Sequence, residues 1–263
     1  MVVATGFLVG RGWEASALSA DPLAVPSASP AGSQAPLLES AAIAPRPNSR
    51  PTEDVATPSP SVLQLPGAVP ARGSGTFTYA SGRGPVLGTK GLLRRFRVAV
   101  ERGSGADPAE FAAQVEAVLG DSRSWVGGGS VRLQRVGGAD PADFTVHLAT
   151  RETAARMCAR GGTNIRVGGR PYTSCRTVGK AIINLDRWRL SAKPYLAAKV
   201  PLAGYRQYVI NHEVGHELGH RHEGCPKAGG PAPVMVQQTL TVRGCVPYPW
   251  PRRGKSMLAG PAI

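Results

Sequence analysis

The sequence has no apolar run long enough to cross a bilayer as a helix, which takes about 20 residues. A short apolar run near its start, Val2 to Gly10, is followed by a tolerable cleavage site at Leu18-Ser19-Ala20. No positive charge precedes this run, as a regular signal peptide would require. We therefore expect residues 1–20 to be a degenerate or truncated signal or anchor segment of an exported protein.

Acidic side chains are scarce, because 17 Asp and Glu stand against 31 Lys and Arg, for a formal net charge of +14. Residues 1–71 hold three basic and five acidic side chains, so residues 72–263 carry a net charge of +16. Such a surface could attract an anionic cell wall, a membrane surface or nucleic acid, although Arg-rich codon usage alone would produce it. We expect no nucleic-acid partner, because no nucleic-acid-binding motif is present.

Cysteine is limited to four residues, Cys158, Cys175, Cys225 and Cys245, none of them in a Cys-x-x-Cys pair. This spacing argues against a zinc ribbon and against a thioredoxin-type motif. An even number of spaced cysteines favours two disulfides in an exported protein over four thiols in a cytosolic one. Four cysteines allow three pairings, and proximity in the sequence favours Cys158–Cys175 and Cys225–Cys245.

Histidine is also rare, yet four of the five histidines lie between Asn211 and His222. His212 and His216 are four residues apart and share one face of a helix. Two imidazoles on one face can hold a single metal ion, with Glu213 beside them as a general base.

The third metal ligand is predicted to be His222 rather than His220. On a straight helix, His212 and His220 would be roughly 12 Å apart, too far to share one zinc ion with ligand distances of about 2.0–2.1 Å. Gly219 can adopt the left-handed conformation that ends a helix, and the chain can then return His222 to the metal.

Residues 21–71 are rich in Pro, Ala and Ser and bury too little apolar area to offset their ordering entropy. We predict a disordered spacer there and one folded domain over residues 72–263. Within the domain, Asp107-Pro108-Ala109-Glu110 is a helix start with a cap, an early proline and a glutamate three positions on. We expect strands at 76–80, 92–101, 131–136, 144–148, 175–178 and 181–185, and helices at 108–119, 150–159 and from about 202.

The pattern His-Glu-x-x-His-x-x-Gly-x-x-His resembles that of the metzincin clan of zinc metalloproteases. The resemblance implies an α+β fold, close to α/β, with a twisted mixed sheet and an antiparallel edge strand along the substrate cleft. Residues 172–177 are the expected edge strand. The resemblance further implies an active-site helix and a small C-terminal subdomain, in which Met235 of Pro233-Val234-Met235-Val236 forms the methionine turn beneath the zinc.

A wider set of residues resembles an exported actinobacterial family catalogued as domain of unknown function 3152. This resemblance extends back to about Gly75 and implies a metzincin-like fold without an established substrate. The residues that carry it are Asn211–His222, Gly224–Pro226, Pro233–Met235, Gln237–Thr239, Gly244-Cys245 and Pro249–Pro251.

The motif predicts a secreted or surface-attached endopeptidase that uses one zinc ion and Glu213 to hydrolyse peptide bonds. The alternative is a non-catalytic, zinc-stabilised binding module of the cell surface or wall, which would need no base. Gln237 occupies the position where some metzincins carry a tyrosine, so Tyr248 or an arginine remains to stabilise the transition state. We expect an extracellular or cell-surface monomer that acts on proteins or peptides.

Overall fold

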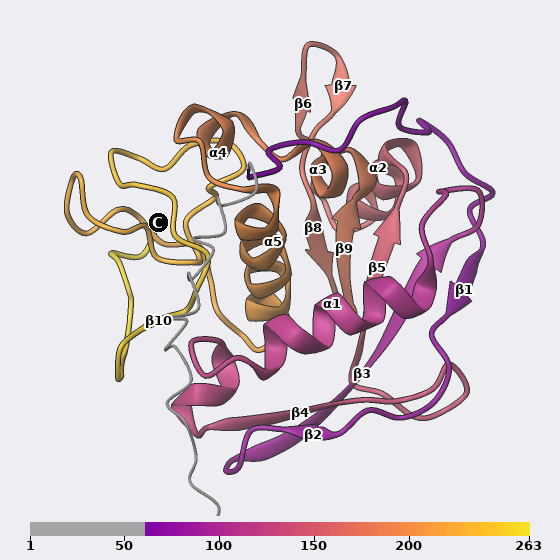
Figure 1. Cartoon of the computed structure of the whole chain (residues 1–263), viewed down its shortest axis with the longest axis horizontal. Helices are drawn as coiled ribbons and strands as arrows, with labels where there is room; N and C mark the ends of the chain where they lie inside the picture. The colour runs from indigo at the N-terminus through magenta and orange to yellow at the C-terminus, as the bar shows by residue number, and fades with distance from the viewer. Residues whose placement is uncertain (1–60) are drawn as a thin grey trace, which may run out of the picture. The chain divides into compact units, whose positions relative to one another are not determined.

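A mixed sheet of seven strands lies at the centre of residues 61–263, the part of the chain that the computed structural model describes (Figure 1). Its main path runs β2-β4-β3-β5-β9-β8, and β1 pairs with the end of β3. The inner pairs are parallel, whereas β1, β2 and β8 each pair antiparallel with a neighbour. The strands are β1 (Phe77–Tyr79), β2 (Val86–Leu87), β3 (Leu92–Glu101), β4 (Val131–Arg135), β5 (Phe144–Ala149), β8 (Cys175–Thr177) and β9 (Lys180–Asn184).

Helices cover both faces of the sheet. Phe96, Val98 and Val100 of β3 contribute to the main core, which also contains the buried side chains of α1 and α5. On the other face, Ala149 and Ile182 pack with α2 in a smaller cluster. The helices are α1 (Pro108–Gly120), the 3-10 helix η1 (Trp125–Gly128), α2 (Arg151–Ala159), α3 (Leu185–Leu190), α4 (Lys193–Ala197) and α5 (Leu202–Glu217).

The strongest local signals produce the elements that they predict. β3 spans Leu92–Glu101 as expected, and α1 begins at Pro108 because the Asp107 side chain accepts a hydrogen bond from Glu110 N at 2.8 Å. α5 begins at Leu202, directly after a proline. The predicted mixed sheet with an antiparallel edge is therefore present, and β8 forms that edge.

The stretch after β9 contains two helices that the sequence did not predict. The strand predicted for 181–185 ends at Asn184, because the side chain of this residue accepts a hydrogen bond from Asp186 N and caps α3. These two helices, α3 and α4, lie between β9 and α5. Pro194 lies in the first turn of α4, where a missing N–H leaves no helical hydrogen bond unmade.

The packed chain begins earlier than the predicted boundary at residue 72. Val62 O accepts a hydrogen bond from Leu202 N, and Leu65 N donates one to Arg189 O, both at 2.8 Å. Residues 62–71 are therefore held on the folded domain by backbone contacts rather than belonging to a free spacer.

Both predicted disulfides are formed. Cys158–Cys175 joins α2 to β8 with a Cα–Cα distance of 5.9 Å, and Cys225–Cys245 spans 5.7 Å. Two disulfides suit an oxidising, extracellular location. Among residues 61–263, no helix combines the length and apolar character that a membrane crossing requires. The predicted signal segment, residues 1–20, lies outside the described residues.

The chain that follows α5 is mostly irregular. It contains one two-stranded hairpin, formed by β10 (Arg252–Arg253) and β11 (Ser256–Met257). Earlier in the chain, before β8, another hairpin of β6 (Arg166–Val167) and β7 (Arg170–Pro171) projects from the end of the sheet in Figure 1. The last residues return to the segment after α5. Gly224 N donates to Pro261 O at 2.7 Å, and Ile263 N donates to His222 O at 3.4 Å.

Candidate metal centre

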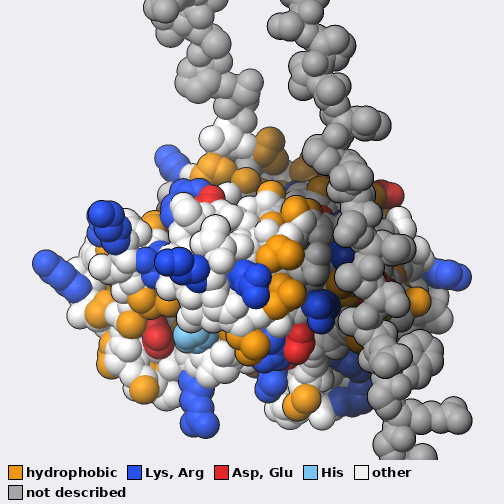
Figure 2. Space-filling model, turned by 90° about the horizontal axis from the view of Figure 1, so that it is seen from below, with side chains coloured by type: hydrophobic (Ala, Val, Ile, Leu, Met, Phe, Trp, Pro, Cys, Tyr) orange, Lys and Arg blue, Asp and Glu red, His pale blue; other side chains and the backbone are white. Residues whose placement is uncertain are grey.

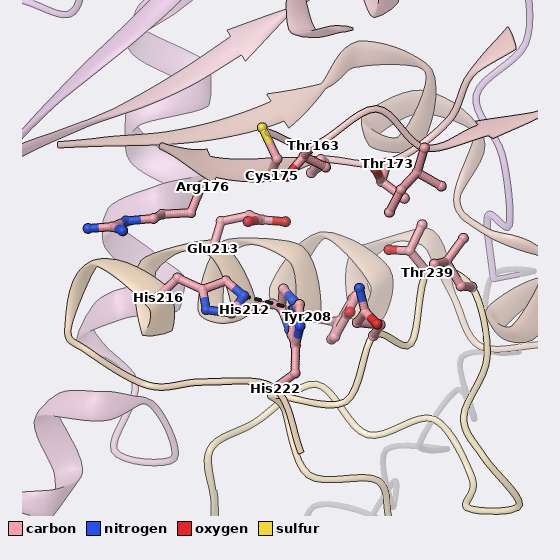
Figure 3. A pocket seen from close by; sticks show the side chains of 14 residues that line it. Thr163, Thr173, Cys175, Arg176, Tyr208, His212, Glu213, His216, His222 and Thr239 are labelled. Atoms are coloured by element: carbon pink, nitrogen blue, oxygen red, sulfur yellow. Dashed lines mark hydrogen bonds between the residues drawn. The ribbon is translucent and has the colours of Figure 1, made fainter. Parts of the chain in front are cut away.

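The helix α5 carries His212 and His216 one turn apart, with ring centroids separated by 4.8 Å (Figure 3). Its opposite side is anchored in the core, where Ile210 and Val214 have no exposed surface. Because that side is fixed, the two histidines are held on the side that faces a cavity.

A turn at the end of α5 adds a third histidine. The helix ends at Glu217, and Gly219 follows with a φ of 97°, in the left-handed region that glycine adopts readily. The turn brings His222 Nε2 to 3.1 Å from His216 Nε2, and the ligand atoms of His212, His216 and His222 all lie within 4.8 Å of one another. Tetrahedral ligands about 2.0–2.1 Å from a zinc ion are roughly 3.3 Å apart, so this spacing is close to that of a metal site.

His220 lies outside this cluster. Its ring stacks on Trp125 with centroids 4.2 Å apart and planes inclined by 23°. Its carbonyl oxygen instead supports the cluster, because it accepts a hydrogen bond from His216 Nδ1 at 2.8 Å. His222, and not His220, therefore lies with the two helix histidines, as predicted from the length of a straight helix.

Hydrogen bonds fix the tautomers of the two helix histidines. His212 Nδ1 donates to Val234 O at 2.8 Å, just as His216 Nδ1 donates to a carbonyl, so each ring keeps a free lone pair on Nε2. Burial lowers the pKa of His212 well below its usual value and also lowers the pKa of His216 and His222. Neutral imidazoles with free Nε2 atoms are the form that binds metal.

Glu213 follows His212 and is buried, with 4% of its surface exposed. Burial raises the pKa of its carboxyl group well above the usual value. Figure 3 shows the carboxylate between α5 and the chain segment that carries Cys175. Glu213 and the three clustered histidines line the same cavity, so a carboxylate stands beside the potential metal ligands without being one of them.

The cavity has a volume of about 250 Å³. One wall is the edge of the sheet, from Thr173 through Arg176, and it includes the edge strand β8. The other wall comes from the segment after α5, including Gln237 and Thr239. An extended chain could therefore enter between an open strand edge and the histidine cluster.

The predicted methionine turn lies against α5. Met235 is 1% exposed, and a Cβ atom added to Gly215 of α5 would stand 2.7 Å from its sulfur. Glycine is therefore required for this close approach. The preceding residue, Val234, supplies the carbonyl that orients His212, so the turn positions a clustered histidine directly.

Three buried tyrosines, which the sequence did not single out, hold the segment after Met235. Tyr208 OH donates to Val236 O, Tyr195 OH donates to Gln238 Oε1, and Tyr205 OH shares a hydrogen bond with Thr239 Oγ1, each at 3.0 Å. The spacing of Tyr205 and Tyr208 on α5 was the available sequence signal. The bonds of Tyr205 and Tyr208 fix one wall of the cavity to α5, which carries two of the histidines, and the bond of Tyr195 fixes it to α4.

One sequence-based candidate needs correction, and one contact could not be foreseen. Glu217 is 9% exposed and pairs with Arg176 Nε of β8 at 2.9 Å, so it ties the end of α5 to the edge strand. Tyr248, a candidate for transition-state stabilisation, does not line the cavity, because its hydroxyl donates to Arg252 O at 2.9 Å. Arg176 is the arginine that does line it.

A family model described as "Protein of unknown function (DUF3152)" matches residues 64–246. The chain belongs to the DUF3152 family. The match begins before Gly75, where the sequence resemblance was expected to start, and it contains α5, all three clustered histidines and Met235. No curated protein and no solved structure matches the chain in the other two comparisons. The candidate site of this DUF3152 protein therefore has to be interpreted from its own residues.

Proposed function

We propose that this protein is a secreted zinc-dependent endopeptidase with a metzincin-like active site. The observation that carries the proposal is the convergence of His212, His216 and His222 beside the buried Glu213, in a cavity bordered by an open strand edge. The alternative, a non-catalytic zinc-stabilised surface module, gives no reason to bury a carboxylate next to the ligands.

The donor set fits one zinc ion. Zinc prefers imidazole nitrogen, and sites with three protein ligands leave one tetrahedral position open for water or substrate. His212 and His216 present free Nε2 atoms because their Nδ1 atoms are bound to carbonyls, and His222 Nε2 is 3.1 Å from that of His216. Met235, packed beneath the helix, agrees with the methionine turn that a metzincin would have.

Zinc bound there would supply Lewis acidity, which polarises a peptide carbonyl and acidifies water. Glu213 would accept the proton of the attacking water and then donate it to the leaving amine. The edge strand β8 would align the substrate by antiparallel pairing next to the cluster.

The substitution Glu213→Gln tests this function. It keeps the side-chain shape and removes the base, so peptide hydrolysis should fall by roughly 10²–10⁴ while bound zinc stays near one ion per chain. Zinc is quantified by mass spectrometry, and cleavage is followed with a proteome-derived peptide library. Glu110→Gln, an exposed glutamate on α1, is the matched control and should change neither value.

The outcomes separate the two candidate functions. Loss of hydrolysis with zinc retained supports the endopeptidase. A wild-type protein that holds zinc and cleaves nothing in the library would instead support the surface-binding module.

A further inference from the structure

A second cavity, of about 360 Å³, lies on the face of the sheet that α2 covers. It is bounded by β1, β3, β5, β9 and α2, and it shares no lining residue with the histidine cavity. Basic side chains are common on the whole domain surface, and they predominate over acidic ones on the face that Figure 2 shows. The question is whether the basic residues of this cavity are arranged for a ligand.

The floor of the cavity places two cations in one row across the sheet. Arg97 of β3 is in register with Thr145 of β5, and Thr145 is in register with Lys180 of β9. Since neighbouring strands are about 4.8 Å apart and register partners point to the same face, Arg97 and Lys180 flank Thr145 on one side of the sheet. Strand pairing therefore fixes the backbone positions of both cations.

The wall of the cavity adds two more cations from α2. Arg156 and Arg160 are four residues apart, so they lie on the same side of the last turn of the helix. The disulfide between Cys158 and Cys175 ties this turn to β8. The two arginines are thus presented by an anchored helix end rather than by a loop.

These four cations have no acidic partner. No Asp or Glu lines the cavity, and within residues 61–263 none of the four side chains forms an ion pair. Arg97 donates to Gly138 O at 3.1 Å and Arg156 to Thr153 Oγ1 at 2.9 Å, and both guanidinium groups retain further donors. The carboxylate of the buried Glu101 lies behind the lining and accepts a hydrogen bond from Thr153 Oγ1 at 2.6 Å, so the cavity keeps an excess of positive charge.

The floor also contains a buried histidine whose hydrogen bonding is weak. His147 of β5 is 5% exposed, its ring meets Phe77 edge-on at 4.9 Å, and its Nδ1 has no hydrogen bond of regular geometry within the described residues. Burial lowers the pKa of His147 to about 4, a weak hydrogen bond with the Thr145 backbone partly opposes this shift, and the charges of Lys180 and Arg97 add to it, so the ring is neutral at neutral pH. His147 therefore adds a neutral polar group to the floor beneath the four cations.

We propose that this cavity binds a phosphate group, either as free phosphate or as the headgroup of an anionic lipid. Phosphate carries up to two negative charges and several acceptor oxygens, which match guanidinium and ammonium donors that line one cavity. A single carboxylate would neutralise only one of the four cations. The site is separate from the histidine cluster, and the proposal does not depend on peptidase activity.

The test compares two double variants that remove the same charge. Arg160→Gln/Lys180→Gln changes the cavity, and neither side chain has another described hydrogen bond, whereas Arg253→Gln/Lys255→Gln changes exposed residues of the β10–β11 hairpin. Calorimetric titration with inorganic phosphate at constant ionic strength should show binding by the wild type. The cavity variant should bind roughly tenfold more weakly or worse, and the hairpin variant within about twofold of wild type.

Vesicle sedimentation distinguishes the two sources of phosphate. Binding to vesicles that contain phosphatidylglycerol, but not to pure phosphatidylcholine, and release by millimolar inorganic phosphate would identify a lipid headgroup. Calorimetric binding without vesicle binding would identify free phosphate. The proposal is overturned if wild type binds neither probe, if both double variants weaken binding equally, or if a poly-glutamate peptide binds the cavity more tightly than phosphate.

Discussion

Each of the clustered histidines is positioned by a different contact. His212 is oriented by the Val234 carbonyl, which comes from the segment beyond α5, whereas His216 is oriented by the nearby His220 carbonyl. His222 reaches the cluster through the turn at Gly219. A substitution that removes a potential metal-binding nitrogen should therefore have a different effect from one at a residue, such as His220, that only orients a clustered histidine.

The comparison of His222→Ala with His220→Ala tests the third ligand. Removing His222 takes a potential ligand nitrogen out of the cluster. Zinc affinity should therefore fall by more than the roughly 10- to 100-fold that is typical when a residue hydrogen-bonded to a metal ligand is replaced. His220→Ala keeps the backbone carbonyl that supports His216, so its loss should stay below that range. Competition with a chelating dye measures both affinities, and a larger loss in His220→Ala would contradict the assignment.

Features of the candidate site could be predicted from the sequence where they depend on residues close together in the chain. The spacing of His212, His216 and Gly219 determines which histidine can return, so the cluster could be predicted. The contact of Trp125 Nε1 with Asn211 O at 3.0 Å could not, because it joins positions 86 residues apart. The pairing of Glu217 with Arg176 could not be predicted for the same reason, since Arg176 comes beside it only when β8 lies next to α5.

At the scale of elements, the irregular segment beyond Met235 owes its shape to side chains rather than to backbone pairing. Gln238 has no exposed surface, and its side chain makes four hydrogen bonds. Its Nε2 donates to Pro233 O and Tyr248 O, and its Oε1 accepts from Tyr195 OH and Tyr248 N. One amide thus connects the methionine turn, α4 and the chain before β10.

The substitution Gln238→Leu should destabilise this segment strongly. It leaves buried donors and acceptors unpaired, each at a cost of roughly 1–3 kcal/mol, so the free energy of unfolding should fall by roughly 3 kcal/mol or more. Gln237→Leu makes the same chemical change one residue away, at a half-buried side chain that lines the cavity. Denaturant titration of both variants is the measurement, and similar losses in the two would refute the role of the Gln238 network.

The elements that the sequence predicted well are those with a strong periodic or capping signal. β3 alternates apolar and basic residues, and α1 has the Asp107 cap, so both were placed within a residue. The short helices α3 and α4 were missed, because helices of six and five residues are too short to show a period. They form where Asn184 caps one and Pro194 starts the other.

At the scale of the whole molecule, two disulfides cross-link regions outside the centre of the sheet. One lies at the edge of the sheet, and the other lies in the irregular chain after α5. Cys158–Cys175 connects α2 to the edge strand, and Cys225–Cys245 closes the irregular chain around the methionine turn. The sequence separations are 17 and 20 residues, so each bond restricts an unfolded loop of similar size.

Replacing each disulfide by a pair of serines should cost roughly 3 kcal/mol of unfolding free energy in both cases, according to the chain-entropy model. Zinc affinity should respond differently. It should fall in Cys225→Ser/Cys245→Ser, because that loop contains Val234, whose carbonyl orients His212, and stay close to wild type in Cys158→Ser/Cys175→Ser. Thermal unfolding and zinc competition on both variants are the measurements, and equal affinity losses would contradict a specific link to the methionine turn.

The return of the final residues to the segment after α5 has a practical consequence for preparing the protein. Ile263 N is bound to the carbonyl of His222, and Gly260 N is bound to the side chain of Glu223 at 3.1 Å. A polyhistidine purification tag appended after Ile263 would therefore place extra imidazoles beside the third clustered histidine, where they would compete for any metal ion bound there and distort its measured stoichiometry. Recombinant material for every zinc measurement should carry its tag ahead of Val62, with a cleavage site between them.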